Sequence, residues 1–286
     1  MKNYTEEYLA SILPVPHEPL NKYSRGKLTV VAGSARYPGA ACLASLASQR
    51  AGAGYTEVVS APEVVGILHG LKPSLVGRSW EEEISFSVQS TGEKPCAFLV
   101  GSGFDPHDPH SHELTLQVLD RAQAPVLCDG GAFDTLVTED GRRLCEKRSS
   151  QNNVTVLTPH EGEAARLAHP FGLKTSDSKR LSLLLANSYH SVVVLKGSTT
   201  FISDGENVFT MSEGTSALAK AGTGDVLAGI IGAFLAQGMA ADDACVLGTI
   251  LHARAGRVAT EKLTSISVVA EDVIDALPHV LANLTR

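Results

Sequence analysis

Short apolar runs recur along the chain, and glycine, proline or small polar residues usually follow them. The runs are rich in Val and Leu, and few polar residues interrupt them. This pattern is typical of parallel strands that are covered on both faces of a sheet, because such strands have no wet side. The predicted strands are Leu28–Ala32, Glu57–Ser60, Ala97–Val100, Val126–Cys128, Val154–Leu157 and Val192–Leu195.

Helix-like stretches lie between many of these strands, at Gly39–Arg50, His112–Ala122, Glu161–Ala168 and Lys179–Ser188. Strands that alternate with helices imply βαβ units and an α/β fold with a mostly parallel sheet. After Lys196 the pattern changes to a hairpin and then to helices, of which the first is apolar almost all round and should be buried. The hairpin strands are Thr200–Ser203 and Asn207–Met211, and the helices are Val226–Gln237, Ala241–Lys262 and Ala270–Asn283.

Glycine or a small polar residue follows five of the predicted strands. In an open α/β sheet, ligands bind beyond the carboxyl ends of the strands, which meet along one edge. Five such segments therefore predict a long ligand groove at this edge. The segments are Gly33-Ser34, Gly101-Ser102-Gly103, Asp129-Gly130-Gly131, Thr158-Pro159-His160 and Lys196-Gly197-Ser198.

A further glycine loop, Ala221-Gly222-Thr223-Gly224-Asp225, runs directly into the apolar helix. Its glycines let backbone N–H groups turn toward one point, and the helix N-terminus adds partial positive charge. We therefore predict an anion hole suited to a phosphate. Asp225 is either a functional carboxylate of that site or a helix N-cap, but an N-cap leaves the two glycines unexplained. The loop fits neither the Walker-type pattern nor the dinucleotide-binding fingerprint.

Composition narrows the class of protein. The chain has 286 residues, of which 43% are apolar and 19% charged, and its formal net charge is −7. One large domain is expected, and the acidic balance argues against nucleic acid as the main partner. Five cysteines without a CxxC pair argue against a disulfide framework or a zinc site. No signal peptide or membrane-spanning run is evident, so we expect a soluble, cytoplasmic protein with no membrane partner.

The glycine loop belongs to a larger set of motifs. They are Lys22 to Gly26, Val30 to Ser34, Tyr37 to Ala41, Gly101 to Gly103, Leu157 to Glu163, Val194 to Gly197 and Ala219 to Gly229. Together they resemble the ADP-dependent NAD(P)H-hydrate dehydratase family of the ribokinase-like superfamily. The resemblance implies a single domain over residues 1–286, with a short lead over 1–20 and no epimerase domain. The fold it implies is a three-layer α/β/α sandwich.

The resemblance also implies a reaction, the repair of NADH or NADPH that is hydrated on the nicotinamide ring. Phosphate would pass from ADP to the carbon-6 hydroxyl of the S-epimer and then leave, because phosphate is a better leaving group than hydroxide. AMP, phosphate and the restored dihydronicotinamide would result. Asp225 would accept the hydroxyl proton, and the amides of Gly222, Thr223 and Gly224 would stabilise the transferring phosphoryl group.

Binding residues and partners follow from the same resemblance. Ala40, Gly103, His160 and Asp225 would contact the hydrated nucleotide, and Glu163 would hold Mg²⁺ through water. ADP would be bound by Lys196, Gly197, Ser198, Thr199, Thr200 and Gly224. Alternatively, His160 is an ordinary loop histidine and Glu163 a helix-capping residue. The implied partners are hydrated NADH or NADPH, ADP or ATP, a separate NAD(P)H-hydrate epimerase, and further copies of this chain in a homo-oligomer such as a tetramer.

Two other functions fit the same loop. One is a small-molecule kinase acting on a hydroxymethylpyrimidine or hydroxyethylthiazole, and the other is a non-catalytic nucleotide sensor. The segment from Thr158 to Glu163 and the Pro38-Gly39-Ala40 motif favour the dehydratase, and Asp225 argues against a sensor because binding alone needs no base. Two segments depart from the family pattern, Asp129 to Phe133 and Gly214 to Ser216.

Overall fold

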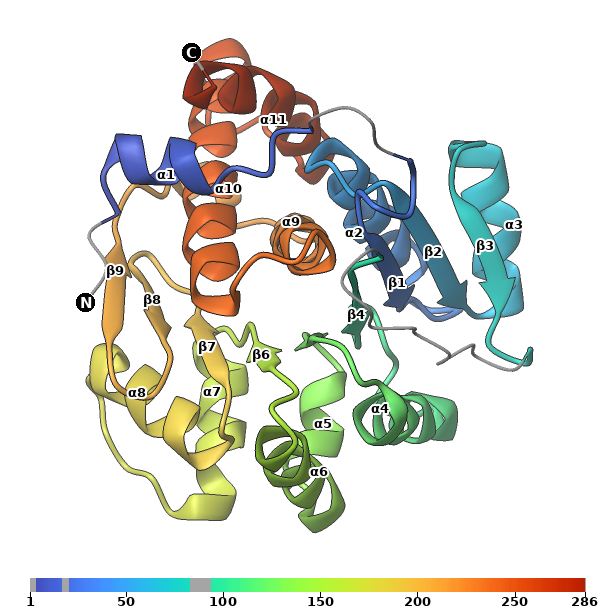
Figure 1. The fold of residues 1–286 in the computed structure, drawn as a ribbon, viewed down its shortest axis with the longest axis vertical. Coiled ribbons are helices and arrows are strands. Elements are labelled where there is room, and N and C mark those ends of the chain that lie inside the picture. Colours follow the sequence, from blue (N-terminus) through green and yellow to red (C-terminus); the bar gives the residue numbers. More distant parts are fainter. Residues whose placement is uncertain (1–3, 17–20, 83–93, 286) are drawn as a thin grey trace.

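A largely parallel sheet forms the centre of the molecule (Figure 1). The computed structural model describes residues 4–16, 21–82 and 94–285. In these residues the strands are β1 (Lys27–Val31), β2 (Tyr55–Ser60), β3 (Val76–Ser79), β4 (Cys96–Val100), β5 (Val126–Cys128), β6 (Thr155–Leu157), β7 (Val192–Leu195), β8 (Thr200–Ser203) and β9 (Val208–Met211). The described strands form one sheet in the order β3-β2-β1-β4-β5-β6-β7-β8-β9. Neighbours from β3 to β7 are parallel, and β8 and β9 add an antiparallel edge.

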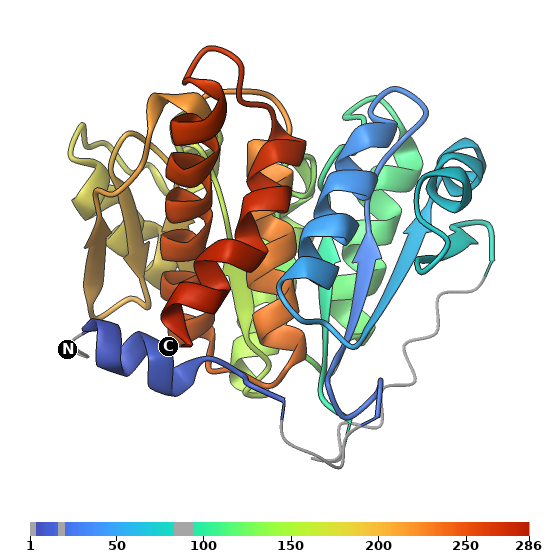
Figure 2. The same ribbon diagram turned by 90° about the horizontal axis from the view of Figure 1, so that it is seen from above.

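Helices cover both faces of this sheet, as Figures 1 and 2 show. One face packs against α2 (Pro38–Arg50), α3 (Pro62–Leu71), α9 (Thr223–Ala236), α10 (Ala241–Leu263) and α11 (Ala270–Leu284). The short helix α1 (Glu6–Ile12) joins the same apolar cluster through its buried side chain Leu9. The other face packs against α4 (Pro109–Arg121), α5 (Ala132–Leu136), α6 (Glu139–Ser150), α7 (Glu161–Ala168) and α8 (Ser178–Ser188). The predicted three-layer α/β/α arrangement is therefore confirmed.

The predicted strands and helices are all present, with small shifts at their ends, but the sequence pattern missed β3 and four helices. β3 contains a single large apolar residue, Val76, so it lacks the buried-strand signal. It is an edge strand that pairs with β2, where Arg78 also lies 3.6 Å from a carboxylate oxygen of Glu57. The missed helices are α1, α3, α5 and α6, of which α5 is short and α6 is mostly polar.

Two further observations concern the class of protein. The five cysteines are free thiols, and all but Cys96 are buried. Within the part of the chain that the structure describes, no helix is both long and apolar enough to cross a membrane.

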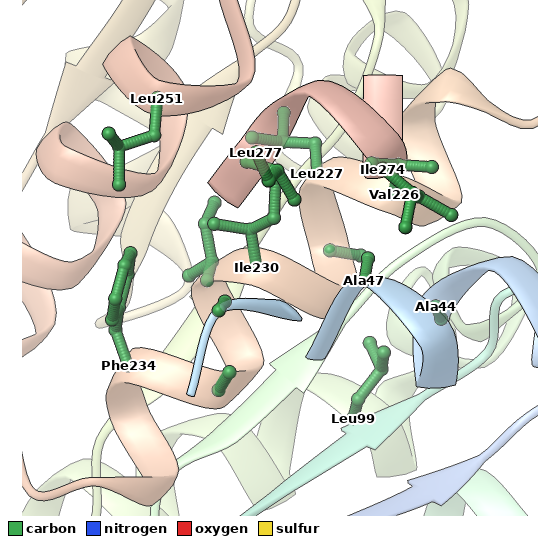
Figure 3. Packing of buried hydrophobic residues seen from close by; sticks show 14 of the residues in the cluster. Ala44, Ala47, Leu99, Val226, Leu227, Ile230, Phe234, Leu251, Ile274 and Leu277 are labelled. Atoms are coloured by element: carbon green, nitrogen blue, oxygen red, sulfur yellow. The ribbon is translucent and has the colours of Figure 1, made fainter. Parts of the chain in front are cut away.

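Close packing of α9 on α2 sets the position of the glycine loop. α9 is buried almost all round, as predicted. A Cβ atom at Gly229 would lie only 2.2 Å from the carbonyl oxygen of Ala44 in α2, so the two helices touch through their backbones. Figure 3 shows Ala44 and Ala47 of α2 near the larger side chains of α9 in the same apolar cluster. The N-terminus of α9 is thereby fixed relative to the sheet.

Gly229→Ala is expected to lower the stability of the protein, because the new methyl group would meet the backbone of Ala44. Overpacking of this kind costs about 1–3 kcal/mol. The measurement is the midpoint of thermal unfolding. Gly66→Ala is the matched control, since Gly66 also lies inside a helix but has open space where its Cβ would be. Alanine there should be neutral or stabilising, and equal losses in both variants would contradict this account of the packing.

Candidate active site

The glycine loop enters α9 through a backbone conformation that favours glycine. Gly222 is the N-cap residue with φ of +91°, and a side chain there would meet Leu43 Cδ1 at 2.6 Å. The Thr223 hydroxyl lies 2.7 Å from the carbonyl oxygen of Leu218 and 2.9 Å from that of Lys220. These two bonds hold the segment that leads into the loop. Thr223 N also donates to Lys220 O at 3.4 Å, and Val226 N donates to Gly222 O at 3.1 Å. The N–H groups of Gly224 and Asp225, which lie between them, have no acceptor within the helix and are available to an anion.

Asp225 does not cap this helix. The N-cap residue is Gly222, no side chain caps the helix, and Asp225 is the third residue of α9. Its carboxyl group instead lies near Ser102, which follows β4, and close enough to Asp129 and Lys196 to interact with their charges. The N-cap interpretation is therefore wrong, and the carboxyl group belongs to the cluster at the strand ends.

Asp129 is the centre of that cluster. It follows β5 and is buried, with only 4% of its surface exposed. Its Oδ1 atom accepts hydrogen bonds from Lys196 Nζ at 3.0 Å and Thr158 Oγ1 at 2.8 Å, and its Oδ2 atom accepts one from Ser102 Oγ at 2.9 Å. The four residues come from the ends of four adjacent strands, β4 to β7. Polar side chains that follow four of the predicted strands thus meet at one edge of the sheet, as the sequence predicted.

Burial and neighbouring charges shift the pKa values of Asp225 and Lys196 in this cluster. The pKa of Asp225 is raised to about 7, first by burial and then by the negative charge of Asp129, while Lys196 and the nearby hydroxyl of Ser102 act in the opposite direction. Burial acts to lower the pKa of Lys196, but the carboxylates of Asp129, Glu163 and Asp225 outweigh it, so this pKa is raised. Lys196 is therefore a cation at neutral pH. Asp225 can take up or release a proton there, as a general base must.

His160 and Glu163 cap α7 reciprocally. His160 Nδ1 accepts hydrogen bonds from the N–H groups of Gly162 and Glu163, at 3.0 and 3.2 Å, and Glu163 Oε2 accepts one from His160 N at 2.7 Å. The capping interpretation of Glu163 is therefore confirmed, and His160 is the N-cap residue of α7 rather than an ordinary loop histidine. His160 still has 59% of its side chain exposed, with Nε2 located 3.5 Å from Glu163 Oε1. Contact of His160 with a substrate stays a prediction.

Glu163 is the residue predicted to hold a magnesium ion through water. Its Oε2 atom is occupied by the capping bond, which leaves Oε1 for a metal or its water. Among residues 4–16, 21–82 and 94–285, no group of three or more His, Cys, Asp or Glu side chains is arranged to hold a metal ion. Mg²⁺ usually keeps waters and is shared with substrate phosphates. The residues therefore fit an ion that is held mainly by the nucleotide and only indirectly by Glu163.

Ala40 and Gly103 meet where β1 lies beside β4. At this point the strand order reverses, which is the usual position of a ligand in such sheets. Gly103 has φ of +68°, and a Cβ atom there would lie 2.5 Å from Ala40 Cβ. Ser34 Oγ donates to the Gly103 carbonyl at 2.8 Å, which joins the two loops. The pair is thus adjacent, as predicted, and Gly103 directly follows the Ser102 that contacts Asp225.

The predicted nucleotide segment forms the turn from β7 to β8. Lys196 is at the end of β7, Gly197 and Ser198 are exposed, Thr199 is half-buried, and Thr200 is buried in β8. A Cβ atom at Gly224 would lie 3.4 Å from Lys196 Nζ, so this turn and the glycine loop are neighbours. The exposed part of the turn is therefore next to the predicted anion hole.

Sequence reasoning did not assign four residues of this cluster. Ser102, Asp129 and Thr158 lie in the strand-end segments that predicted the groove, and a search of these segments for buried hydrogen-bonding side chains would have found them. His252 is different, because it lies inside the long α10 helix. Nothing in the spacing of that helix indicates a polar role for His252.

Comparison with known proteins identifies the family. The family model for NAD(P)H-hydrate dehydratase matches residues 28–279. The chain belongs to the NAD(P)H-hydrate dehydratase family. It is 30% identical over 282 residues to the ADP-dependent (S)-NAD(P)H-hydrate dehydratase of Xanthomonas campestris, covering 96% of this chain and 94% of that one. It is 32% identical over 291 residues to the bifunctional NAD(P)H-hydrate repair enzyme of Moorella thermoacetica, covering 98% of this chain and 54% of that protein, so it spans about half of this relative's length.

Solved structures agree with this NAD(P)H-hydrate dehydratase assignment. An ADP/ATP-dependent NAD(P)H-hydrate dehydratase from Bacillus subtilis, co-crystallised with ATP and Mg²⁺, superposes with a TM-score of 0.83 and 26% identity over 98% of both chains. A ribokinase-like superfamily protein from Enterococcus faecalis superposes with a TM-score of 0.76 and 24% identity, covering 98% of this chain and 95% of that one. The predicted ribokinase-like fold is confirmed.

Asp225→Asn is expected to stabilise the protein above pH 7 and to have little effect near pH 4. A carboxyl group whose pKa is raised in the folded state binds more protons folded than unfolded between its two pKa values, about 4 and 7. Its contribution to stability therefore falls as the pH rises through this window, and asparagine removes that loss. We expect a gain of roughly 1–3 kcal/mol at pH 8, measured as the midpoint of thermal unfolding at several pH values.

The control for this measurement is Asp275→Asn, which removes an exposed carboxylate of α11. It should change the unfolding midpoint equally little at all pH values. A stabilisation by Asp225→Asn that does not grow with pH would contradict the assignment of a raised pKa to Asp225.

Proposed function

We propose that this protein converts the S-epimer of hydrated NADH or NADPH back to NAD(P)H and couples the reaction to conversion of ADP to AMP and phosphate. The observation that carries the proposal is a buried carboxyl group, Asp225, with a pKa raised to about 7, beside Lys196 at the start of α9. A site that only binds a nucleotide has no use for such a base. The membership of the chain in the dehydratase family supports the choice of substrate.

The first stage transfers a phosphoryl group. The carbon-6 hydroxyl of the hydrated ring attacks the β-phosphorus of ADP, and Asp225 accepts the hydroxyl proton. The bond between this phosphorus and the oxygen of AMP breaks, and AMP leaves with the electron pair. The N–H groups from Gly222 to Gly224 at the start of α9 stabilise the charge on the transferring group, and Lys196 adds a positive charge nearby.

The second stage eliminates the phosphate. The bond between carbon 6 and oxygen breaks, and the electron pair leaves with the phosphate while the ring nitrogen donates its lone pair. Loss of a proton from the neighbouring ring carbon then restores the dihydronicotinamide. The hydroxyl oxygen ends in the phosphate, so the water that had been added to the ring is removed. Ala40 and Gly103, which pack against each other beside Ser102, line the substrate side of the site. His160, which is exposed beside this edge, contacts the same substrate.

The phosphate donor binds at the turn after β7. Lys196, Gly197, Ser198, Thr199 and Gly224 hold the nucleotide, and Thr200 anchors the turn in β8. The relative from Xanthomonas is named ADP-dependent and the one from Bacillus ADP/ATP-dependent, so we propose that ADP or ATP serves here. Glu163 would hold one water of an Mg²⁺ ion bound to the nucleotide phosphates, and such an ion would neutralise part of their charge.

Partners are proposed by the same reasoning. An NAD(P)H-hydrate epimerase supplies the S-epimer, and the reaction takes place in the cytoplasm, where NADH, NADPH and ADP are available. We further propose a homo-oligomer, such as a tetramer, which light scattering would test. The small residues of α10 do not supply its interface, because Ala244, Gly248 and Ala255 are buried against the chain's own helices, with Gly248 next to Ile231.

Turnover should depend on Asp225 and on its ionised form. With hydrated NADH, ADP and Mg²⁺, the recovery of absorbance at 340 nm should increase with pH and reach half its maximum near pH 7, because the base acts only when deprotonated. Asp225→Asn should lower kcat by about 10²–10⁴-fold and leave the Kd for ADP within a few-fold. Near-normal turnover by this variant would refute the role of Asp225. Phosphorylation of a pyrimidine or thiazole alcohol without recovery of absorbance would support the kinase instead.

Lys196→Gln should weaken the use of ADP and shift the pH profile. Loss of a charge-assisted contact to phosphate is worth about 1.5–3 kcal/mol, which corresponds to a decrease of roughly 10–100-fold in kcat/KM for ADP. The positive charge of Lys196 acts to lower the pKa of Asp225, so its removal should move the rise in activity to higher pH. Lys262→Gln, near the exposed end of α10, is the control and should leave both measurements unchanged. An unshifted profile for Lys196→Gln would contradict the coupling of these two residues.

A further inference from the structure

The connecting segment between β9 and α9, residues 212–222, touches two parts of the candidate active site. Near its start, a Cβ atom at Gly214 would lie 3.8 Å from the carbonyl oxygen of Ser198, in the turn from β7 to β8. Farther along, the carbonyl oxygen of Leu218 accepts a hydrogen bond of 2.7 Å from Thr223 Oγ1, at the start of α9. The connecting segment therefore lies against the proposed nucleotide turn and leads into the glycine loop.

Two arginines of α10 hold the start of this segment. Arg254 Nε donates to Glu213 Oε2 at 3.0 Å, and Arg254 Nη2 donates to Glu213 Oε1 at 3.3 Å. Arg257 Nε donates to the backbone carbonyl oxygen of Glu213 at 2.6 Å. The side chain and the backbone of Glu213 are thus bound to the same helix. A guanidinium group that meets a carboxylate at two points fixes its orientation as well as its distance.

The same helix holds the connecting segment at a second point, by apolar packing. A Cβ atom at Gly256 would lie 2.7 Å from Leu218 Cδ2, so Leu218 sits directly on the backbone of α10. Most of α10 is buried, which makes it a fixed support for both contacts. Gly214 lies between the two points of attachment, beside the turn from β7 to β8.

Arg254 also binds a second carboxylate, on α1. Its Nη1 and Nη2 atoms donate to Glu6 Oε2 and Oε1, at 3.0 and 2.6 Å. One guanidinium group therefore holds two carboxylates, of which Glu213 belongs to the connecting segment and Glu6 to α1. These two contacts have the same chemistry but different structural consequences, so they can be compared directly.

We propose that Arg254 and Arg257 are positioning residues for the phosphate donor, because they hold Glu213 and with it the connecting segment against the turn from β7 to β8. The inference rests on the proposed function of that turn, and it adds residues that act through Glu213. A turn that is held in its binding geometry before the nucleotide arrives avoids the cost of ordering it on binding. Loosening of the connecting segment should therefore weaken the binding of ADP. Ala40 and Gly103 belong to other loops, so the KM for hydrated NADH should not follow.

Glu213→Ala tests the proposal, because it removes both contacts between this side chain and Arg254. It should raise the KM for ADP about 3–10-fold, keep kcat within about threefold, and leave the KM for hydrated NADH within about twofold. Arg254→Gln should show the same pattern and provides a second variant if Glu213→Ala does not fold. The double variant should be no worse than Arg254→Gln alone, since the two residues act through one contact.

Glu6→Ala is the matched control, since it removes the other carboxylate of the same guanidinium group. It should keep the KM for ADP within about twofold of wild type, and both alanine variants should lower the midpoint of thermal unfolding only slightly, as is usual for partly exposed ion pairs. An equal rise of the KM for ADP in Glu6→Ala and Glu213→Ala, or no rise in Glu213→Ala, would overturn the positioning role.

The proposed function and this inference fail in different ways. Turnover of hydrated NADH by the wild type is measured first, and its absence would refute the proposed function. The Kd for ADP, measured by calorimetry on the same variants, then decides the inference by itself. Weaker binding in Glu213→Ala but not in Glu6→Ala would support it, and equal Kd values in the three proteins would overturn it. A wild-type protein that does not bind ADP would overturn both.

Discussion

The charged cluster at the strand ends depends on one cation, Lys196, which lies among three carboxylates. Lys196 contacts Asp129 directly, and Glu163 and Asp225 lie near enough to keep it protonated. Asp129 is buried, and three donors satisfy its oxygens. Its negative charge, together with burial, raises the pKa of Asp225 to about 7. If either partner of the Lys196–Asp129 pair were lost, an uncompensated charge would remain in a buried place.

The sheet and α9 bring these groups together from distant parts of the chain. Parallel strands carry Ser102, Asp129, Thr158 and Lys196 to one edge, because each strand ends at the same side of the sheet. Asp225 lies on α9, in the helix layer that covers one face of the sheet. The position of α9 is set by the contact of its backbone with α2 at Gly229. The site therefore depends on core packing as much as on the polar residues themselves, and a small displacement of α9 would separate the base from the strand ends.

The site is also a place of local instability that the rest of the fold supports. A carboxyl group with a raised pKa resists ionisation, yet the proposed reaction needs it ionised. His252 adds a second buried polar group behind the same loop. Residues of this kind are typical of functional sites. Such groups destabilise the fold locally, and the packing of the surrounding structure offsets this loss of stability.

The sequence by itself determined the fold class and the outline of the site. Runs of apolar residues and their spacing are local properties, so they predicted the parallel strands, the buried α9 and the edge where ligands bind. The motifs around Asp225 and Lys196 indicated the family. They also left open whether Asp225 capped the helix, which the observed turn at Gly222 decided.

Only the tertiary structure decided which groups act on which. β3 and α6 are too polar to predict from apolar patterns, and they form because neighbouring elements pair with them or cover them. The partners of Asp129 depend on the order of the strands. Such contacts join residues that are far apart along the chain. The raised pKa of Asp225 is likewise a product of burial and of charges from other elements, which no local pattern of residues contains.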